Sequence, residues 1–354
     1  MYKIGNTMCR LFRSSMLSLK DAVYGFTPYV GYPKNGNIGD EHLYHLALRY
    51  LKPANLIYDM FTRGRLLKVS LLGSKGYYLV GGGSLIFGKD FISKFERLSS
   101  LGFSPIFWGT GSRELPTDQN QQKHWNSLLK EAQGGVRGVL TQQCFQKIGL
   151  NVEVIGDTGF LINLDFDTND FAEDYVVIIP RLIPFRNALL HALDLKRLDY
   201  LKDLVDKLAS LGVKIVVYLP CMEDAPDLQL WLSTMKTIVH IQVYNGEIDP
   251  FIKLVRGAKA VVSMRLHPGI FAYALGTPTA FIEARDKYFD AISILSDKPA
   301  MMDVNKFSKE ELLKHVVDLL QEDLEMRKER FRSVRTIALN QLERSKKIAS
   351  LLVG

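Results

Sequence analysis

An arginine and a histidine two positions apart are the side chains of this 354-residue chain best suited to chemistry. Arg265 and His267 stand where the apolar run 260–262 gives way to a helical pattern that starts near Pro268 and ends at Gly276. The unpaired amide groups and the positive end of such a helix favour a bound anion, as does a nearby guanidinium. The pair therefore predicts a site for phosphate or carboxylate. The alternative is an arginine in a surface ion pair and a histidine that only caps the helix.

An acidic residue near the start of the chain is a second candidate for chemistry. Asp40 precedes the helical pattern of residues 43–51, at the place where a helix N-cap is expected. Its carboxylate predicts either a cap or an acceptor for a ligand hydroxyl, by hydrogen bonding or as a general base. Asn37 could hold the same turn or contact a ligand, and the sequence leaves both roles open.

Two glycine-rich turns follow predicted strands. Residues 81–84 read Gly-Gly-Gly-Ser after the apolar run 77–80, and residues 109–111 read Gly-Thr-Gly. Neither completes a Gly-x-Gly-x-x-Gly dinucleotide fingerprint, because Ile86 and Glu114 stand where the third glycine is required, and no Walker A lysine is present. A nicotinamide or ATP site is therefore not indicated. The glycines are typical of tight turns, or of backbone that closely approaches a ligand or another segment.

The elements that must position these residues follow an α/β pattern, in which short β-rich runs alternate with helical stretches. The segment 165–174 is acidic and has neither helical nor strand periodicity, so we place a domain linker there. The predicted domains are residues 1–168 and 169–354, and the second ends in a long helical pattern over 308–352. The predicted strands are residues 77–80, 106–108, 139–140, 152–155, 175–179, 214–219, 240–243, 260–263 and 279–282.

Composition agrees with a large two-domain protein, since 47% of the residues are hydrophobic. No apolar run is long enough to span a bilayer and no signal-peptide pattern is present, so we expect the protein to stay in the cytoplasm. Three widely separated cysteines suggest neither a disulfide framework nor a zinc site. The net charge of +7 fits an anionic partner. The basic, partly apolar segment 1–20 is typical of a solvated helix or frayed terminus, and the alternative is contact with the inner face of an anionic membrane.

Six short motifs follow one another along the chain. They are residues 37–41 (Asn-Ile-Gly-Asp-Glu), 81–84, 109–111, 136–141 (Val-Arg-Gly-Val-Leu-Thr), Gly156-Asp157 and 263–272, with Gly276-Thr277-Pro278 after them. Their order and spacing resemble the polysaccharide pyruvyl transferase family over about residues 35–290. Two positions depart from the family pattern, because Thr158 and Val139 stand where proline is common. Both changes are tolerable in turns, and they suggest a divergent member.

The resemblance implies two Rossmann-like doubly wound domains that face a cleft, an architecture of the GT-B type with ligands at the carboxyl ends of the strands. It also implies an enzyme that joins phosphoenolpyruvate, as co-substrate, to two hydroxyls of a sugar as a cyclic pyruvate ketal. The expected partners are phosphoenolpyruvate and a saccharide, free or lipid-linked, with no nucleic acid, no metal and no further cofactor. Oligomeric state is left open.

The resemblance also suggests roles for individual residues. His267 is the expected general acid or acid/base, with Asp40 as a second catalytic candidate. Arg265 is the expected main anchor of the donor in the second domain. The other expected donor contacts are Arg181, Leu266 and Lys287, and the expected acceptor or cleft residues are Asn37, Gly82, Gly83, Arg137 and Glu283.

Several alternatives stay open at this stage. Arg137 could contact a ligand or brace its loop, Lys287 could form an exposed ion pair, and Glu283 could cap a loop. His42 and His45 have a spacing that could hold a metal or line the cleft, but no third ligand is visible, which favours solvent or core placement. For the whole protein, the rivals are a GT-B glycosyltransferase that uses a nucleotide sugar and a catalytically silent subunit of polysaccharide assembly.

Overall fold

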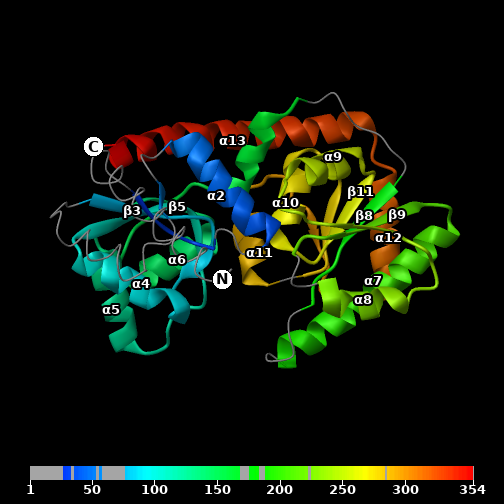
Figure 1. The fold of residues 1–354 in the computed structure, drawn as a ribbon, viewed down its shortest axis with the longest axis horizontal. Helices are drawn as coiled ribbons and strands as arrows, with labels where there is room; N and C mark the ends of the chain where they lie inside the picture. Colours follow the sequence, from blue (N-terminus) through cyan, green and yellow to red (C-terminus); the bar gives the residue numbers. More distant parts are fainter. Residues whose placement is uncertain are drawn as a thin grey trace, which may run out of the picture.

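The protein consists of two lobes, each built on a parallel sheet (Figure 1). The computed structural model describes residues 27–32, 36–52, 56–57, 76–167, 175–182, 188–221, 225–283 and 285–353. The basic segment 1–20 and the predicted domain boundary between residues 168 and 169 lie outside these ranges. The two doubly wound domains predicted from the sequence are confirmed.

The first lobe has a seven-stranded sheet in the order β2-β1-β3-β5-β6-β7, with β4 paired to β5. Alternate residues of a strand face opposite sides of a sheet, so Tyr78 and Val80 pack under α4, α5 and α6, whereas Leu79 packs under α2. The elements are β1 (Thr27–Val30), α2 (Ile38–Leu51), β2 (Leu56–Ile57), β3 (Gly76–Val80), β4 (Gly83–Ile86), α4 (Lys89–Ser100), β5 (Phe103–Ser112), α5 (Gln119–Leu129), β6 (Gln133–Val136), α6 (Val139–Lys147) and β7 (Glu153–Val154).

The second lobe has a six-stranded parallel sheet in the order β10-β9-β8-β11-β12-β13. Helices α7, α8 and α12 cover one face and α9 and α10 the other. The elements are β8 (Tyr175–Ile179), α7 (Ala188–Ser210), β9 (Lys214–Leu219), α8 (Ala225–Ser233), β10 (His240–Val243), α9 (Asp249–Gly257), β11 (Ala260–Ser263), α10 (Leu266–Ala274), β12 (Thr279–Phe281), α11 (Asp286–Ala291), β13 (Ala300–Met301) and α12 (Lys309–Leu320).

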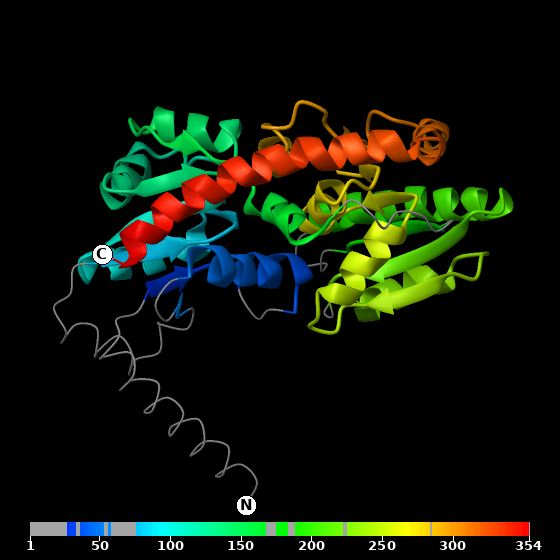
Figure 2. The ribbon, with the colours of Figure 1, turned by 90° about the horizontal axis from the view of Figure 1, so that it is seen from above.

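Helix α13 (Leu324–Val353) crosses both lobes (Figures 1 and 2). Its Val334 is buried in the core of the second lobe and its Ile348 in the core of the first. Trp108 of β5 donates a hydrogen bond of 2.8 Å from Nε1 to Oγ of Ser345. The 3-10 helix η1 (Thr158–Asp165) lies between the sheets and packs under α13. The last helix therefore ties the lobes together.

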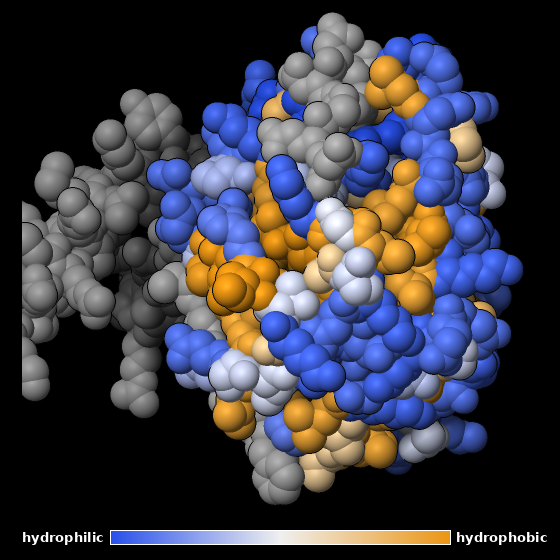
Figure 3. All heavy atoms as spheres, turned by 90° about the vertical axis from the view of Figure 1, so that its right-hand side faces the viewer, coloured by the Kyte–Doolittle hydropathy of each residue, from blue (hydrophilic) through white to orange (hydrophobic). Residues whose placement is uncertain are grey.

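The outer side of the second lobe carries separate apolar areas among hydrophilic ones (Figure 3). Strand β10 lies at the edge of its sheet, and its Ile241 and Val243 are both exposed. Within the described ranges, no helix is both long and apolar enough to cross a bilayer.

Two local predictions were wrong. Val139 and Leu140 open helix α6 instead of forming a strand; the strand is β6, whose Gln-Gly-Gly-Val sequence lacks an apolar run. The long pattern over 308–352 divides into α12 and α13, since a separate capping box at Ser308 starts α12 and the chain turns after Leu320.

Candidate active site

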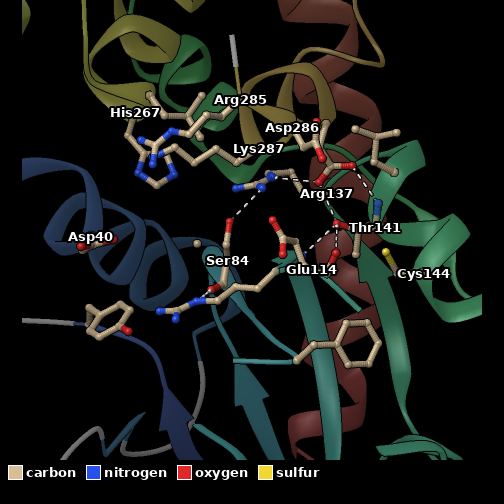
Figure 4. A pocket seen from close by; sticks show the side chains of 18 of the residues that line it. Asp40, Ser84, Glu114, Arg137, Thr141, Cys144, His267, Arg285, Asp286 and Lys287 are labelled. Atoms are coloured by element: carbon tan, nitrogen blue, oxygen red, sulfur yellow. Dashed lines mark hydrogen bonds and ion pairs between the residues drawn. The ribbon is translucent and has the colours of Figure 1, made fainter. Parts of the chain in front are cut away.

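A cleft of about 1150 Å³ lies between the lobes, where the carboxyl ends of both sheets meet. In parallel α/β sheets this is the usual position of a ligand site. Both lobes contribute polar side chains to its walls (Figure 4). The lining residues are Tyr32, Asn37, Asp40, Gly83, Ser84, Phe87, Lys89, Asp90, Ser112, Arg113, Glu114, Arg137, Leu140, Thr141, Cys144, Leu190, Arg265, Leu266, His267, Pro268, Arg285, Asp286, Lys287 and Asp290.

Arg265 and His267 lie at the start of α10 and line the cleft, as the sequence indicated, and anion binding there stays a prediction. Arg265 is the N-cap residue of this helix, and its side chain makes no cap hydrogen bond to the amides of the first turn, which are those of Leu266 and His267 because Pro268 has no N–H. Ser263 holds the turn, because its Oγ accepts from the amide of Arg265 and donates to the carbonyl of the same residue. Burial, with the charge of Arg181, lowers the pKa of Arg265 to about 10. Pro268 stands in the first turn of the helix, as expected.

His267 lies deep in the cleft, with a side chain that is 11% exposed. Burial lowers its pKa to about 4; Asp40 opposes this shift, and Arg137 and Lys287 add to it. The neutral form of His267 therefore follows mainly from burial. Gly39 of α2 packs against the imidazole, and a Cβ at this position would lie 2.7 Å from Nδ1.

Cationic side chains outnumber acidic ones on the cleft walls. In Figure 4, His267, Arg285 and Lys287 come from the second lobe and face Arg137 and Ser84 of the first. Burial and the neighbouring Arg285 and Arg181 lower the pKa of Lys287 well below its ordinary value. A bound anion would reverse part of that shift. The cationic residues are Lys89, Arg113, Arg137, Arg265, Arg285 and Lys287, and the acidic ones are Asp40, Asp90, Glu114, Asp286 and Asp290.

Arg137 braces the two lobes against each other. Its Nε donates to Oδ2 of Asp290 at 3.2 Å and its Nη2 to Oγ of Ser84 at 3.1 Å. Asp290 also accepts from the amide and the hydroxyl of Thr141, at 3.0 and 2.7 Å. Gly111 is required beside this network, since a Cβ there would collide with the guanidinium of Arg137. Arg137 lines the cleft as well, so ligand contact stays a prediction.

Arg181 and Glu283 lie behind the cleft, in a buried ion-pair network. Arg181 pairs through Nε and Nη2 with both oxygens of Asp194, and Nη1 contacts Glu283. Arg197 joins the same two carboxylates. Glu283 contacts Nε of Arg285 at 2.6 Å and so holds that guanidinium at the cleft wall. The donor contact of Arg181 and the sugar contact of Glu283 remain predictions, because neither residue lines the cleft.

At the start of α2, the expected N-cap was assigned to the wrong residue. Asn37 caps the helix, with its Oδ1 accepting from the amide of Gly39 at 2.9 Å, and Asp40 stands in the first turn and lines the cleft. Gly83 also lines the cleft, with a φ of +102° that favours glycine. Gly82 instead packs against Leu43, which a Cβ would displace.

Asp157 is a site residue that the sequence analysis did not select. It follows β7, is 1% exposed, and its Oδ2 lies 3.7 Å from Nε2 of His267. Burial raises its pKa to about 6, while Arg137 acts in the opposite direction. The Gly156-Asp157 motif was the available signal, but nothing local relates it to His267. Among the described residues, no cluster of three or more His, Cys, Asp or Glu is arranged to hold a metal ion.

The two parallel sheets and the cleft at their carboxyl ends define a two-lobed α/β fold of the GT-B type. A sequence model described as polysaccharide pyruvyl transferase matches residues 26–285, which is most of the chain. The chain therefore belongs to the polysaccharide pyruvyl transferase family. No curated protein sequence matches it significantly.

Solved structures share the fold at low sequence identity. A glycosyltransferase from Rickettsia africae ESF-5 has a TM-score of 0.60 at 12% identity, over 93% of this chain and 98% of that one. UDP-GlcNAc 2-epimerase from Methanocaldococcus jannaschii, in complex with UDP-GlcNAc and UDP, has a TM-score of 0.56 at 13% identity, over 84% and 93%. Anabaena Alr3699/HepE in complex with UDP-glucose has a TM-score of 0.55 at 13% identity, over 92% and 98%. Such likeness establishes the GT-B fold alone.

Proposed function

We propose that this protein transfers the pyruvyl group of phosphoenolpyruvate to two hydroxyls of one sugar residue, as a cyclic ketal, with release of phosphate. The acceptor is a polysaccharide or its lipid-linked precursor. The observation that carries the proposal is a single cleft that combines the uncapped start of α10, a buried imidazole and six basic side chains. Family membership supports the same reaction class.

The donor suits the second-lobe wall of the cleft. Phosphoenolpyruvate carries a phosphate and a carboxylate, and so requires several fixed positive donors. Arg265, Lys287 and the first amides of α10 supply them on one side. Arg285 lies beside them and is held by Glu283. The bound anion would raise the pKa of both Lys287 and His267, because each gains a negative neighbour.

The chemistry assigns the proton transfers to His267. A proton from its imidazolium adds to the methylene carbon, and one sugar hydroxyl attacks the adjacent carbon and loses its proton. Phosphate then leaves with the electrons of the C–O bond, the second hydroxyl closes the ring, and its proton leaves with the product phosphate or the base. Asp40 lies close enough to raise the pKa of His267, and is the candidate base for a hydroxyl. The reaction needs no further cofactor.

A second candidate function, sugar transfer from a nucleotide sugar, is favoured by the structural neighbours solved with UDP or UDP-sugars. The diphosphate of such a donor has the same charge requirement as phosphoenolpyruvate. A silent assembly subunit would bind neither donor.

The deciding experiment compares ligands by melting temperature and then looks for product. A ligand at 100 times its dissociation constant adds about 2.7 kcal/mol of stability. We expect phosphoenolpyruvate to stabilise the protein more than UDP-glucose, UDP-GlcNAc or inorganic phosphate, and Arg265→Ala to remove the effect. Mass spectrometry of candidate saccharides should then show the added pyruvyl mass. Stabilisation by a nucleotide sugar alone, with sugar transfer, would replace this proposal with the second candidate.

A further inference from the structure

The two oxygens of the Asp157 carboxylate have different surroundings. Oδ1 caps η1 by accepting from the amide of Gly159 at 2.8 Å. Oδ2 is buried and faces Nε2 of His267 at 3.7 Å, and neither of these atoms makes a hydrogen bond with any described residue. A movement of less than about 1 Å would bring the two atoms to hydrogen-bond distance.

Capping alone does not account for a carboxylate at this position. An N-cap needs one acceptor oxygen, and Asn or Ser supplies it as well as Asp does. A second, buried carboxylate oxygen is costly unless a donor reaches it. Asp118 makes the same kind of cap on α5, accepting from the amide of Asn120 at 3.0 Å, but it is exposed, so its second oxygen is solvated.

The backbone around Asp157 is held by hydrogen bonds from Gln341 and by close packing at Gly156. Gln341 of α13 donates from Nε2 to the carbonyls of Asp157 and Ile155, both at 3.0 Å. Gly156 has a φ of +94°, and a Cβ there would collide with Gln341 and Ile294. The position of the carboxylate is thus fixed, and the imidazole can be oriented against it.

We propose that Asp157 is the positioning residue of His267. It accepts a hydrogen bond from Nε2–H, fixes that tautomer, and stabilises the imidazolium when a substrate anion enters the cleft. His267 therefore exchanges its catalytic proton through Nδ1, which lies next to Gly39 in the first turn of α2. The catalytic part of this proposal rests on the proposed function; the pairing itself does not.

The charges around the pair are consistent with this role. Asp40 on α2 favours the charged form of His267, whereas Arg137 after β6 and Lys287 on α11 favour the neutral form. His42 of α2 also lies near, and burial lowers its pKa to about 3, which keeps it neutral. When Oδ2 of Asp157 comes within hydrogen-bond distance of Nε2, its negative charge opposes the effect of the two cations on the pKa of His267.

The test is an NMR titration of the full-length protein, with the His267 resonance assigned from His267→Gln. In the presence of inorganic phosphate, Asp157→Asn should lower the pKa of His267 by at least about one unit, a tenfold loss of proton affinity. Asn keeps the cap at η1, and the matched variant Asp118→Asn should leave the titration unchanged. An unchanged His267 titration in a folded Asp157→Asn protein overturns the proposal.

Two further measurements separate the outcomes. In the wild-type protein, the NMR chemical shift of His267 plotted against pH should show a second inflection at the pKa of Asp157. This tests the pairing even if Asp157→Asn does not fold. A single inflection counts against the pairing. With phosphoenolpyruvate and acceptor, Asp157→Asn should lower kcat at least tenfold while the KM for phosphoenolpyruvate stays within about twofold. A shifted titration in a protein without pyruvyl transfer would remove the proposed function and keep the pairing. A tenfold rise in the KM for phosphoenolpyruvate without a change in kcat would contradict the positioning role.

Discussion

Replacement of Asp290 by alanine should destabilise the whole molecule, because this carboxylate joins the two lobes. Asp290 is 2% exposed and accepts hydrogen bonds from Arg137 and twice from Thr141. Asp290→Ala removes the ion-pair partner of the buried Arg137 guanidinium, which keeps its hydrogen bond to Ser84. Breaking a buried ion pair in this way costs about 3–5 kcal/mol, most of it from the uncompensated charge.

The expected change in melting temperature follows from the length of the chain. An unfolding entropy of about 2.1 cal/mol/K per residue amounts to roughly 0.7 kcal/mol/K over 354 residues. A loss of about 3–5 kcal/mol therefore lowers Tm by about 4–7 °C. Differential scanning calorimetry with and without phosphoenolpyruvate measures this directly.

Two matched variants show whether the buried charge is the cause. Glu114→Gln removes an exposed carboxylate from the same cleft, and should change Tm by less than about 1 °C. Arg137→Met combined with Asp290→Leu removes both charges, and should recover at least half of the loss, because the guanidinium is no longer buried without its ion-pair partner. If Asp290→Ala lowers Tm by less than about 1.4 °C, which corresponds to about 1 kcal/mol, the reasoning is refuted, because this contact then does not hold the lobes together.

Four other predictions concern the cleft and the adjoining helix α2. His267→Ala should abolish phosphate release at saturating donor without lowering Tm, and normal turnover in this variant would count against the catalytic role of His267. Arg265→Ala should raise the KM for phosphoenolpyruvate about 30-fold, the equivalent of about 2 kcal/mol. An unchanged KM would count against the role of Arg265 in donor binding. Gly39→Ala should lower kcat at least tenfold in a folded protein, because the new Cβ would lie 2.7 Å from the His267 ring. An unchanged kcat in steady-state kinetics would show that the added methyl group is tolerated and would contradict this prediction. Burial lowers the pKa of His42 to about 3, below its unfolded value of about 6.5, so stability present above pH 6.5 is lost as pH falls towards 3, by up to about 1.4 kcal/mol per unit. His42→Leu should reduce the loss of unfolding free energy between pH 6.5 and pH 3, as measured by urea titrations at several pH values. The same loss in both proteins would contradict the lowered pKa of His42.

Much of the architecture could be read from local patterns. Apolar runs such as 175–179 and 260–263 are strands, as predicted, because a buried parallel strand needs a continuous apolar stretch. Arg265 and His267 were found for the same reason: a strand, a turn and a helix start within a few residues place them at the carboxyl edge of a sheet.

Local patterns failed where a distant segment decided the outcome. Asn37 and Asp40 are both good cap residues, and the choice between them depends on the second lobe: the amide of Ile38 donates to the carbonyl of Pro220, and Asn37 forms a bridge with Cys221. Strand β6 was missed because its glycines resemble a turn, although Gly134 and Gly135 are needed where neighbouring backbone and side chains come close.

The sequence by itself determined the alternation of strands and helices, the glycine turns and the place of Arg265 and His267 between a strand and a helix, since these depend on neighbours along the chain. Only the tertiary structure decided which charges meet. It placed Asp157 beside His267, Arg137 against Asp290, and Arg181 with Glu283 behind the cleft rather than in it. The reason is physical: the pKa and role of a buried ionisable group depend on desolvation and on charges within a few ångströms, and those charges come from segments that are remote in the sequence.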